Sequence, residues 1–127
     1  MATEFAIAFD LSRQVKPKEA QPKPRYPARI ARLLALAHAL DARLQAGEFK
    51  DYAEMARALG LTRARVTQIM DLLLLAPDIQ EEILFMEAAV GEAQINGVDL
   101  RSVVAAQDWE EQRRRWAKLS TRKAASK

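Results

Sequence analysis

The stretch 52–73, YAEMARALGLTRARVTQIMDLL, decides the fold. It holds two short amphipathic segments separated by Gly60, which stands where the end of a helix favours a residue that tolerates a left-handed backbone. Thr62 follows two residues later and can cap a second helix by accepting an orphan backbone N–H. We therefore predict one helix over about 52–59, a tight turn, and a second helix over about 63–75. Together they form a helix-turn-helix.

The two predicted helices each have one apolar face, and the small Ala56 allows them to approach each other closely. Placed on a helical wheel, the second helix turns Val66, Ile69 and Leu73 to one side. The inward residues of the whole stretch are expected to be Met55, Leu59, Leu61, Val66 and Ile69. The opposite face is then free to contact a partner.

That opposite face of the second helix carries residues suited to reading DNA bases: Arg63, Ala64, Thr67 and Gln68. Ala64 lets the helix sit close to the groove floor and can touch a thymine methyl, while Gln68 can pair with adenine through two hydrogen bonds. Arg63 can contact guanine, and Thr67 can make adaptable contacts. A merely solvated face is the alternative, but a solvated helix face more often carries a run of glutamates.

Other residues around the helix-turn-helix are better placed for phosphates, which fix register without reading sequence. They are Thr62, Arg65 and Lys50. Upstream, residues 12–27 form a basic, proline-rich linker that includes Arg25 and cannot be helical. Basic arms can reach into a DNA minor groove, but a solvated tether is the more ordinary role, and the sequence leaves both open.

The rest of the chain predicts an all-α fold, a small helical bundle over 28–118. Further helices are expected at 28–47, from Pro77 onward, after a cap at Asp99, and after a cap at Asp108. The last helix places Trp109 and Trp116 two turns apart on one face, and we slightly favour a core position for Trp109.

The two chain ends differ from this helical domain. Residues 3–11 alternate Phe5, Ile7, Phe9 and Leu11 with small or polar residues, which is typical of a short strand with one apolar face. Because a lone strand is not stable, its partner would be the same segment of a second copy; an unstructured N-terminal end is weighed equally. Residues 119–127 are expected to be a disordered basic tail.

Composition limits the function classes. The 127 residues carry a net charge of +3, half of them are hydrophobic and none is cysteine, which fits a protein of the reducing cytoplasm, associated with the nucleoid if it binds DNA. His38 is the single histidine, and we find no Gly-rich phosphate loop. We therefore expect no enzyme, no metal, no cofactor and no membrane association.

The run 51–84 resembles the DNA-binding region of the ParB/KorB group of partition proteins and related repressors. The matching parts are Ala56, Gly60 and Val66, then the leucine-rich 72–75, then the proline-started acidic helix 77–84. The resemblance implies a recognition-helix role for Thr62, Arg63, Ala64, Arg65, Thr67 and Gln68. Full partition proteins also carry a nucleotide-binding domain before this region. Nothing before Ala28 fits one, so we expect no nucleotide binding.

The segment 108–116, DWEEQRRRW, also looks like the end of small helix-turn-helix proteins found beside site-specific recombinases of mobile elements. We therefore expect a sequence-specific double-stranded DNA-binding protein, a transcriptional repressor or accessory factor of a mobile element, acting as a homodimer. The alternative is a protein–protein adaptor of a recombination or partition complex, docking on a recombinase or another mobile-element protein without reading DNA.

Overall fold

The computed structural model describes residues 23–125, with side chains up to Arg122. The expected strand at 3–11 and residues 12–22 of the linker lie outside the described residues. The helices are α2 (Arg29–Gln45), α3 (Tyr52–Leu59), α4 (Arg63–Asp71), α5 (Pro77–Leu84), α6 (Gly97–Val104) and α7 (Trp109–Ala125), with the 3-10 turn η1 (Leu72–Leu74). Two short strands, β1 (Tyr26–Pro27) and β2 (Glu87–Ala88), pair antiparallel. The predicted all-α fold is confirmed.

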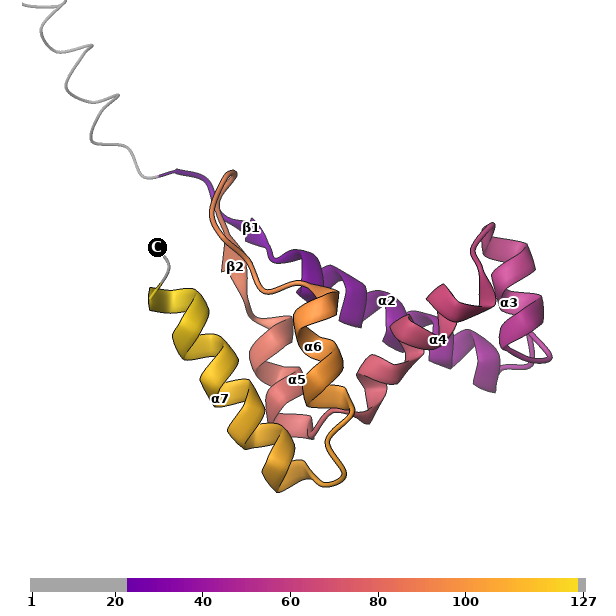
Figure 1. Ribbon diagram of the computed structural model, residues 1–127. Coiled ribbons are helices and arrows are strands. Elements are labelled where there is room, and N and C mark those ends of the chain that lie inside the picture. Colours follow the sequence, from indigo (N-terminus) through magenta and orange to yellow (C-terminus); the bar gives the residue numbers. More distant parts are fainter. Residues whose placement is uncertain (1–22, 126–127) are drawn as a thin grey trace, which may run out of the picture.

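Figure 1 shows that α2 spans the molecule and that the helix-turn-helix, α3 and α4, packs at its C-terminal end. Helices α5, α6 and α7 gather at the other end, beside the two strands. Two hydrophobic clusters follow this division, and both include residues of α2. Leu33 and Leu73 pack against both clusters and so join them.

The turn of the helix-turn-helix has the predicted backbone. Asp51 caps α3 by accepting from the Glu54 N–H at 2.9 Å, and Thr62 caps α4 by accepting from the Arg65 N–H at 3.1 Å. Between them Gly60 adopts a φ of 68°, in the left-handed region that a β-carbon disfavours. Local backbone chemistry therefore fixes where α3 begins and ends and where α4 begins.

Replacing Gly60 by alanine is expected to lower the free energy of unfolding by about 1–2 kcal/mol, because the φ of 68° strains any residue with a β-carbon. Valine should cost more. An added β-carbon would meet no atom within 4 Å, so the loss reports backbone strain alone. Chemical denaturation of the variants measures it.

Gly97 is the matched control, because it lacks a left-handed φ and its β-carbon would meet only Leu33 Cδ2 at 3.9 Å, an ordinary contact. Gly97→Ala should therefore leave stability unchanged or raise it by about 0.4–1 kcal/mol. Equal losses at Gly60 and Gly97 would contradict the turn geometry.

The cluster behind the helix-turn-helix confirms most of the predicted inward residues. Met55, Val66 and Ile69 are 2% exposed or less, and Leu59 packs partly against them. The prediction for Leu61 is wrong, since its side chain is 38% exposed. Leu61 lies in the turn, outside both helices, where helical periodicity no longer decides where a side chain points.

Helix α4 ends earlier than the sequence predicted. It stops at Asp71, and the leucine-rich segment continues as η1 before an extended residue, Leu75, leads into the proline-started α5. Leu72 and Leu75 are both buried, 4% and 1% exposed. The chain has to turn here to bury both, and Gln80 supports the turn by donating to the carbonyls of Leu73 and Leu75.

The C-terminal part departs from prediction in its helix starts and its tail. Asn96, not Asp99, caps α6, and the two side chains form a reciprocal capping box. Helix α7 continues to Ala125 and buries Leu119, so the disordered tail predicted from residue 119 is wrong. Apolar residues at helical spacing continue along α7 to Leu119, although the basic composition of this segment predicted disorder.

The predicted core position of Trp109 is wrong. Trp116 is buried, 6% exposed, and its indole N–H donates to Glu82 of α5. Trp109, the first residue of α7, is 51% exposed. Only Trp116 belongs to the core of the protomer.

Candidate nucleic-acid interface

The predicted base-reading face of α4 is open to solvent. Arg63, Ala64 and Gln68 are exposed, and Thr67 is half-buried. The opposite face packs inward through Val66, Ile69 and Met70, none more than 4% exposed. The helix is therefore held from behind by apolar contacts while a polar face remains accessible.

The two predicted threonines already hold structural hydrogen bonds. The Thr62 hydroxyl accepts from the Arg65 N–H as the helix cap, and the Thr67 hydroxyl donates to the Arg63 carbonyl at 3.0 Å. Thr67 has thus committed its single proton, and only its oxygen lone pairs remain for an outside partner. If this face reads bases, the groups still free to do so are mainly those of Arg63, Ala64 and Gln68.

The cations around α4 differ from those of α7 in their partners. In the described part of the chain, no ion pair forms at Lys50, Arg57, Arg63, Arg65 or Arg101. The same holds for Arg29 and Arg32 of α2. An arginine without an internal carboxylate keeps its full charge available to a phosphate.

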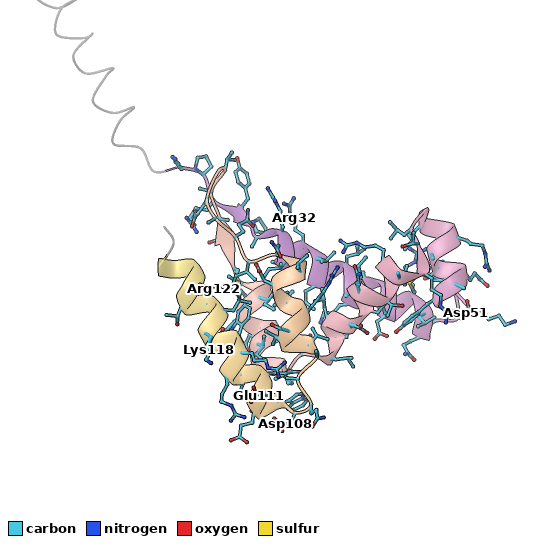
Figure 2. The ribbon with its side chains drawn as sticks, viewed as in Figure 1. Arg32, Asp51, Asp108, Glu111, Lys118 and Arg122 are labelled. Atoms are coloured by element: carbon cyan, nitrogen blue, oxygen red, sulfur yellow. The ribbon has the colours of Figure 1, made fainter. Side chains whose placement is uncertain are left out.

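The arginines of α7 are held by carboxylates. Arg113 pairs with Asp78 at 3.0 Å, and Arg114 and Arg115 both pair with Glu111. Hydrogen bonds from these guanidinium groups lower the pKa of Asp78 and the pKa of Glu111. Figure 2 shows Glu111 on α7 at the far side of the molecule from Asp51, which caps α3. The cations around α4 are therefore unpaired within the described residues, whereas Arg113, Arg114 and Arg115 of α7 are each paired with a carboxylate.

Lys50 and Arg25, both predicted to contact DNA, lie in different places. Lys50 is exposed in the loop that leads into α3, directly before the Asp51 cap. Arg25 donates to the Glu87 carbonyl at 2.8 Å and pairs with Glu92 at 3.2 Å. Figure 1 shows β1, which follows Arg25, at the end of α2 away from α3.

Arg25 therefore holds the β1–β2 strand pair, and the structure does not bring it together with the α4 residues. The last two residues of the predicted non-helical linker, Tyr26–Pro27, are extended and pair with Glu87–Ala88 as strand β1. Proline is compatible with this two-residue pairing at a sheet edge.

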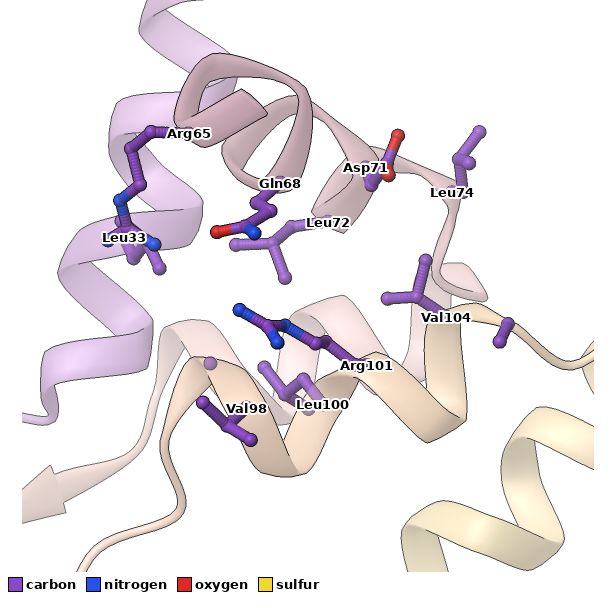
Figure 3. Close-up of a pocket in the computed structure, with 12 residues that line it drawn as sticks. Leu33, Arg65, Gln68, Asp71, Leu72, Leu74, Val98, Leu100, Arg101 and Val104 are labelled. Atoms are coloured by element: carbon purple, nitrogen blue, oxygen red, sulfur yellow. The ribbon is translucent and has the colours of Figure 1, made fainter. Parts of the chain in front are cut away.

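Sequence reasoning missed one residue of this surface, Arg101 of α6. Figure 3 shows the Arg101 and Gln68 side chains directed toward each other across a pocket between α4 and α6. Arg65 lines the same pocket. Nothing in the local sequence around residue 101 signals this, since it depends on the path of the chain through α5 and the loop before α6.

His38 is not part of this surface. Its Nε2 lies 2.8 Å from the Gln80 Oε1, which links α2 to α5. Among the described residues, no group of three or more histidine, cysteine or acidic residues is arranged to hold a metal ion. Within the same residues, no helix has the length and apolar character needed to cross a bilayer.

Comparison of the chain with protein-family models, with curated proteins and with solved structures finds no match. The resemblance of 51–84 to the ParB/KorB group therefore stays a prediction carried by its motif residues. What the molecule offers to a partner is the α4 face and the cations around it.

Proposed function

We propose that this chain is a sequence-specific double-stranded DNA-binding protein that reads the major groove with α4. It would act as a transcriptional repressor or as an accessory factor of a mobile element, without catalytic activity. The observation that carries the proposal is the exposed face of α4, which places Arg63, Ala64 and Gln68 outward over a buried apolar face. The unpaired cations around it suit the DNA backbone.

The dimensions of α4 suit a groove. Its nine residues give a rod about 14 Å long at 1.5 Å per residue, and the major groove admits one α-helix. In helix-turn-helix proteins the N-terminal residues of the recognition helix contact base edges. Arg63 and Ala64 occupy that position here, and the positive end of the helix dipole lies beside them.

A homodimer is part of the proposal. One recognition helix covers only a few base pairs, whereas two copies on a palindrome place their helices about 34 Å apart. The last helix could supply part of the dimer contact, and of its two tryptophans only the exposed Trp109 is available for it, because Trp116 is buried. The strand expected at 3–11 lies outside the described residues.

Selection of bound fragments from random duplexes tests the proposal. We expect a consensus sequence, with a two-fold symmetric arrangement if the protein binds as a dimer. Binding to the selected duplex should weaken with salt by about 0.9 log units per log unit of salt for each phosphate contacted. No consensus, together with no preference over competitor DNA, would overturn the proposal.

Replacing Gln68 by alanine is expected to relax the base preference at one position of each half-site, at a cost of about 1–3 kcal/mol for the preferred base. The reason is the loss of two hydrogen bonds to a base edge. Repeating the selection with the variant measures this. Gln107→Ala, at an exposed position before α7, is the control. A consensus unchanged from that of the wild type would show that Gln68 does not read a base.

The second candidate is a protein–protein adaptor that docks on a recombinase or another protein of a mobile element. Exposed large apolar side chains favour it, above all Phe85 and Val90, which are 78% and 83% exposed. An adaptor of this kind would show no consensus in the selection, and its interaction with a protein partner would depend on these apolar residues.

A further inference from the structure

A pocket of about 590 Å³ lies between α4 and α6, with part of α2 at one side. Figure 3 shows the side chains that line it. This volume is within the range of about 300–1,000 Å³ that small-molecule sites occupy. The same surface of α4 forms one wall of the pocket and part of the proposed DNA interface, so the two sites share residues.

The floor of the pocket is apolar. Leu72 and Leu100 are buried, 4% and 1% exposed, and Leu33 is half-buried beside them. At the rim, Leu74 and Val98 are 60% and 64% exposed. Covering these rim side chains with an apolar ligand body would remove apolar surface from water, which is favourable.

The polar groups are not spread evenly around this floor. Figure 3 shows Gln68 and Arg101 facing each other, with Arg65 toward the same end of the pocket. Asp71 lies toward the other end, beside Leu74. Neither arginine is in an ion pair within the described residues. One end therefore offers two guanidinium groups and an amide, which suit a carboxylate.

We propose that this α4–α6 pocket binds a small anionic amphiphile, a carboxylate carrying an apolar chain or ring, and that its occupancy excludes DNA. The carboxylate would lie between Arg65 and Arg101, and the apolar body would cover the leucine floor toward Leu74, past Asp71. The claim that the ligand excludes DNA rests on the proposed DNA-binding function, because it requires that Arg65 and Gln68 also face DNA.

The effect of this competition on DNA affinity can be calculated. When ligand and DNA exclude each other, the apparent dissociation constant for DNA rises by the factor 1 + [L]/Kd, about 11-fold at a ligand concentration ten times its own Kd. The ligand would thus act as an inducer that releases the protein from its operator.

The pocket is tested first without DNA, by amide NMR of the ¹⁵N-labelled full chain titrated with sodium octanoate below its micelle concentration. We expect the amide signals of α6 and of Gln68 to Asp71 to shift with a saturable dependence, and 1-octanol, which lacks the charge, to bind more weakly. Arg101→Gln should weaken octanoate binding roughly tenfold or more. Lys118→Gln, which removes an exposed cation of α7 that does not line the pocket, should not.

Shifts confined to other surfaces, or octanoate binding that Arg101→Gln leaves unchanged, would overturn the proposal. The Arg101→Gln spectrum itself shows whether that variant is folded. The second arm adds octanoate to the protein on its selected duplex, where release of DNA is expected. Octanoate that fills the pocket without weakening DNA binding would refute the exclusion. If no duplex is selected at all, the proposed DNA-binding function fails. The NMR titration still shows whether the pocket binds octanoate.

Discussion

Replacing Ala64 by glutamate is expected to abolish specific DNA binding while leaving the fold intact. Ala64 is exposed in the first turn of α4, where a recognition helix comes closest to the bases. A carboxylate there would face the negative potential of DNA, and such like-charge contacts cost several kcal/mol. Affinity should fall at least about 100-fold, since each 1.4 kcal/mol is a factor of ten. The positive end of the α4 dipole favours glutamate, so stability should not fall.

Ala117→Glu is the matched control for this prediction. Ala117 is exposed on α7, and the substitution changes the net charge by the same amount. Fluorescence anisotropy with the selected duplex should show near wild-type affinity for Ala117→Glu and almost none for Ala64→Glu, and thermal denaturation should show both folded. Equal affinities of the two variants would mean that DNA does not approach α4, which would leave the adaptor as the better function.

The parts of the fold that could be predicted are those set by local backbone chemistry. Gly60, the two helix caps Asp51 and Thr62, and Pro77 at the start of α5 each act within a few residues of the chain. A capping residue or a left-handed glycine starts or ends a helix without any tertiary contact. These residues were therefore enough to place the helix-turn-helix and the exposed face of α4.

The parts that could not be predicted depend on how distant segments meet. Periodicity placed Trp109 and Trp116 on one face of a helix but could not show that Trp116 is buried and donates to Glu82 of α5 while Trp109 is exposed. Arg101 and Gln68 are 33 positions apart in sequence, and their meeting depends on the η1 turn and on where α6 packs. The pocket was accordingly missed, although the residues on both of its walls were assigned to helices.

Arg25 shows that composition alone does not identify the partners of a side chain. A basic, proline-rich stretch is compatible both with an arm on DNA and with a tether. Its last residues instead form a strand pair, and two acceptors from the β2 region, the Glu87 carbonyl and the Glu92 carboxylate, hold the guanidinium. Both acceptors lie more than 60 positions along the chain, so no local pattern could identify them.

Replacing Gln112 by methionine is expected to lower the free energy of unfolding by about 2–4 kcal/mol. Gln112 of α7 is 3% exposed and accepts from the Ala76 N–H at 2.8 Å while donating to the Leu74 carbonyl at 3.2 Å. Methionine fills a similar volume but makes neither bond, so the Ala76 N–H is left buried without a partner. Chemical denaturation measures the loss. Gln107→Met, the same change at an exposed position, should be nearly neutral.

The same variant tests whether α4 depends on the C-terminal helices for its position. Gln112 holds the segment that directly follows α4, but α4 itself packs on α2 and α3 through Val66, Ile69 and Met70. We therefore expect hydrogen exchange to accelerate at η1 and α7 in Gln112→Met, with the α4 amides still protected. DNA affinity of the folded variant should then stay close to wild type. Acceleration throughout α4 would show instead that α7 also holds the reading face in place, through η1.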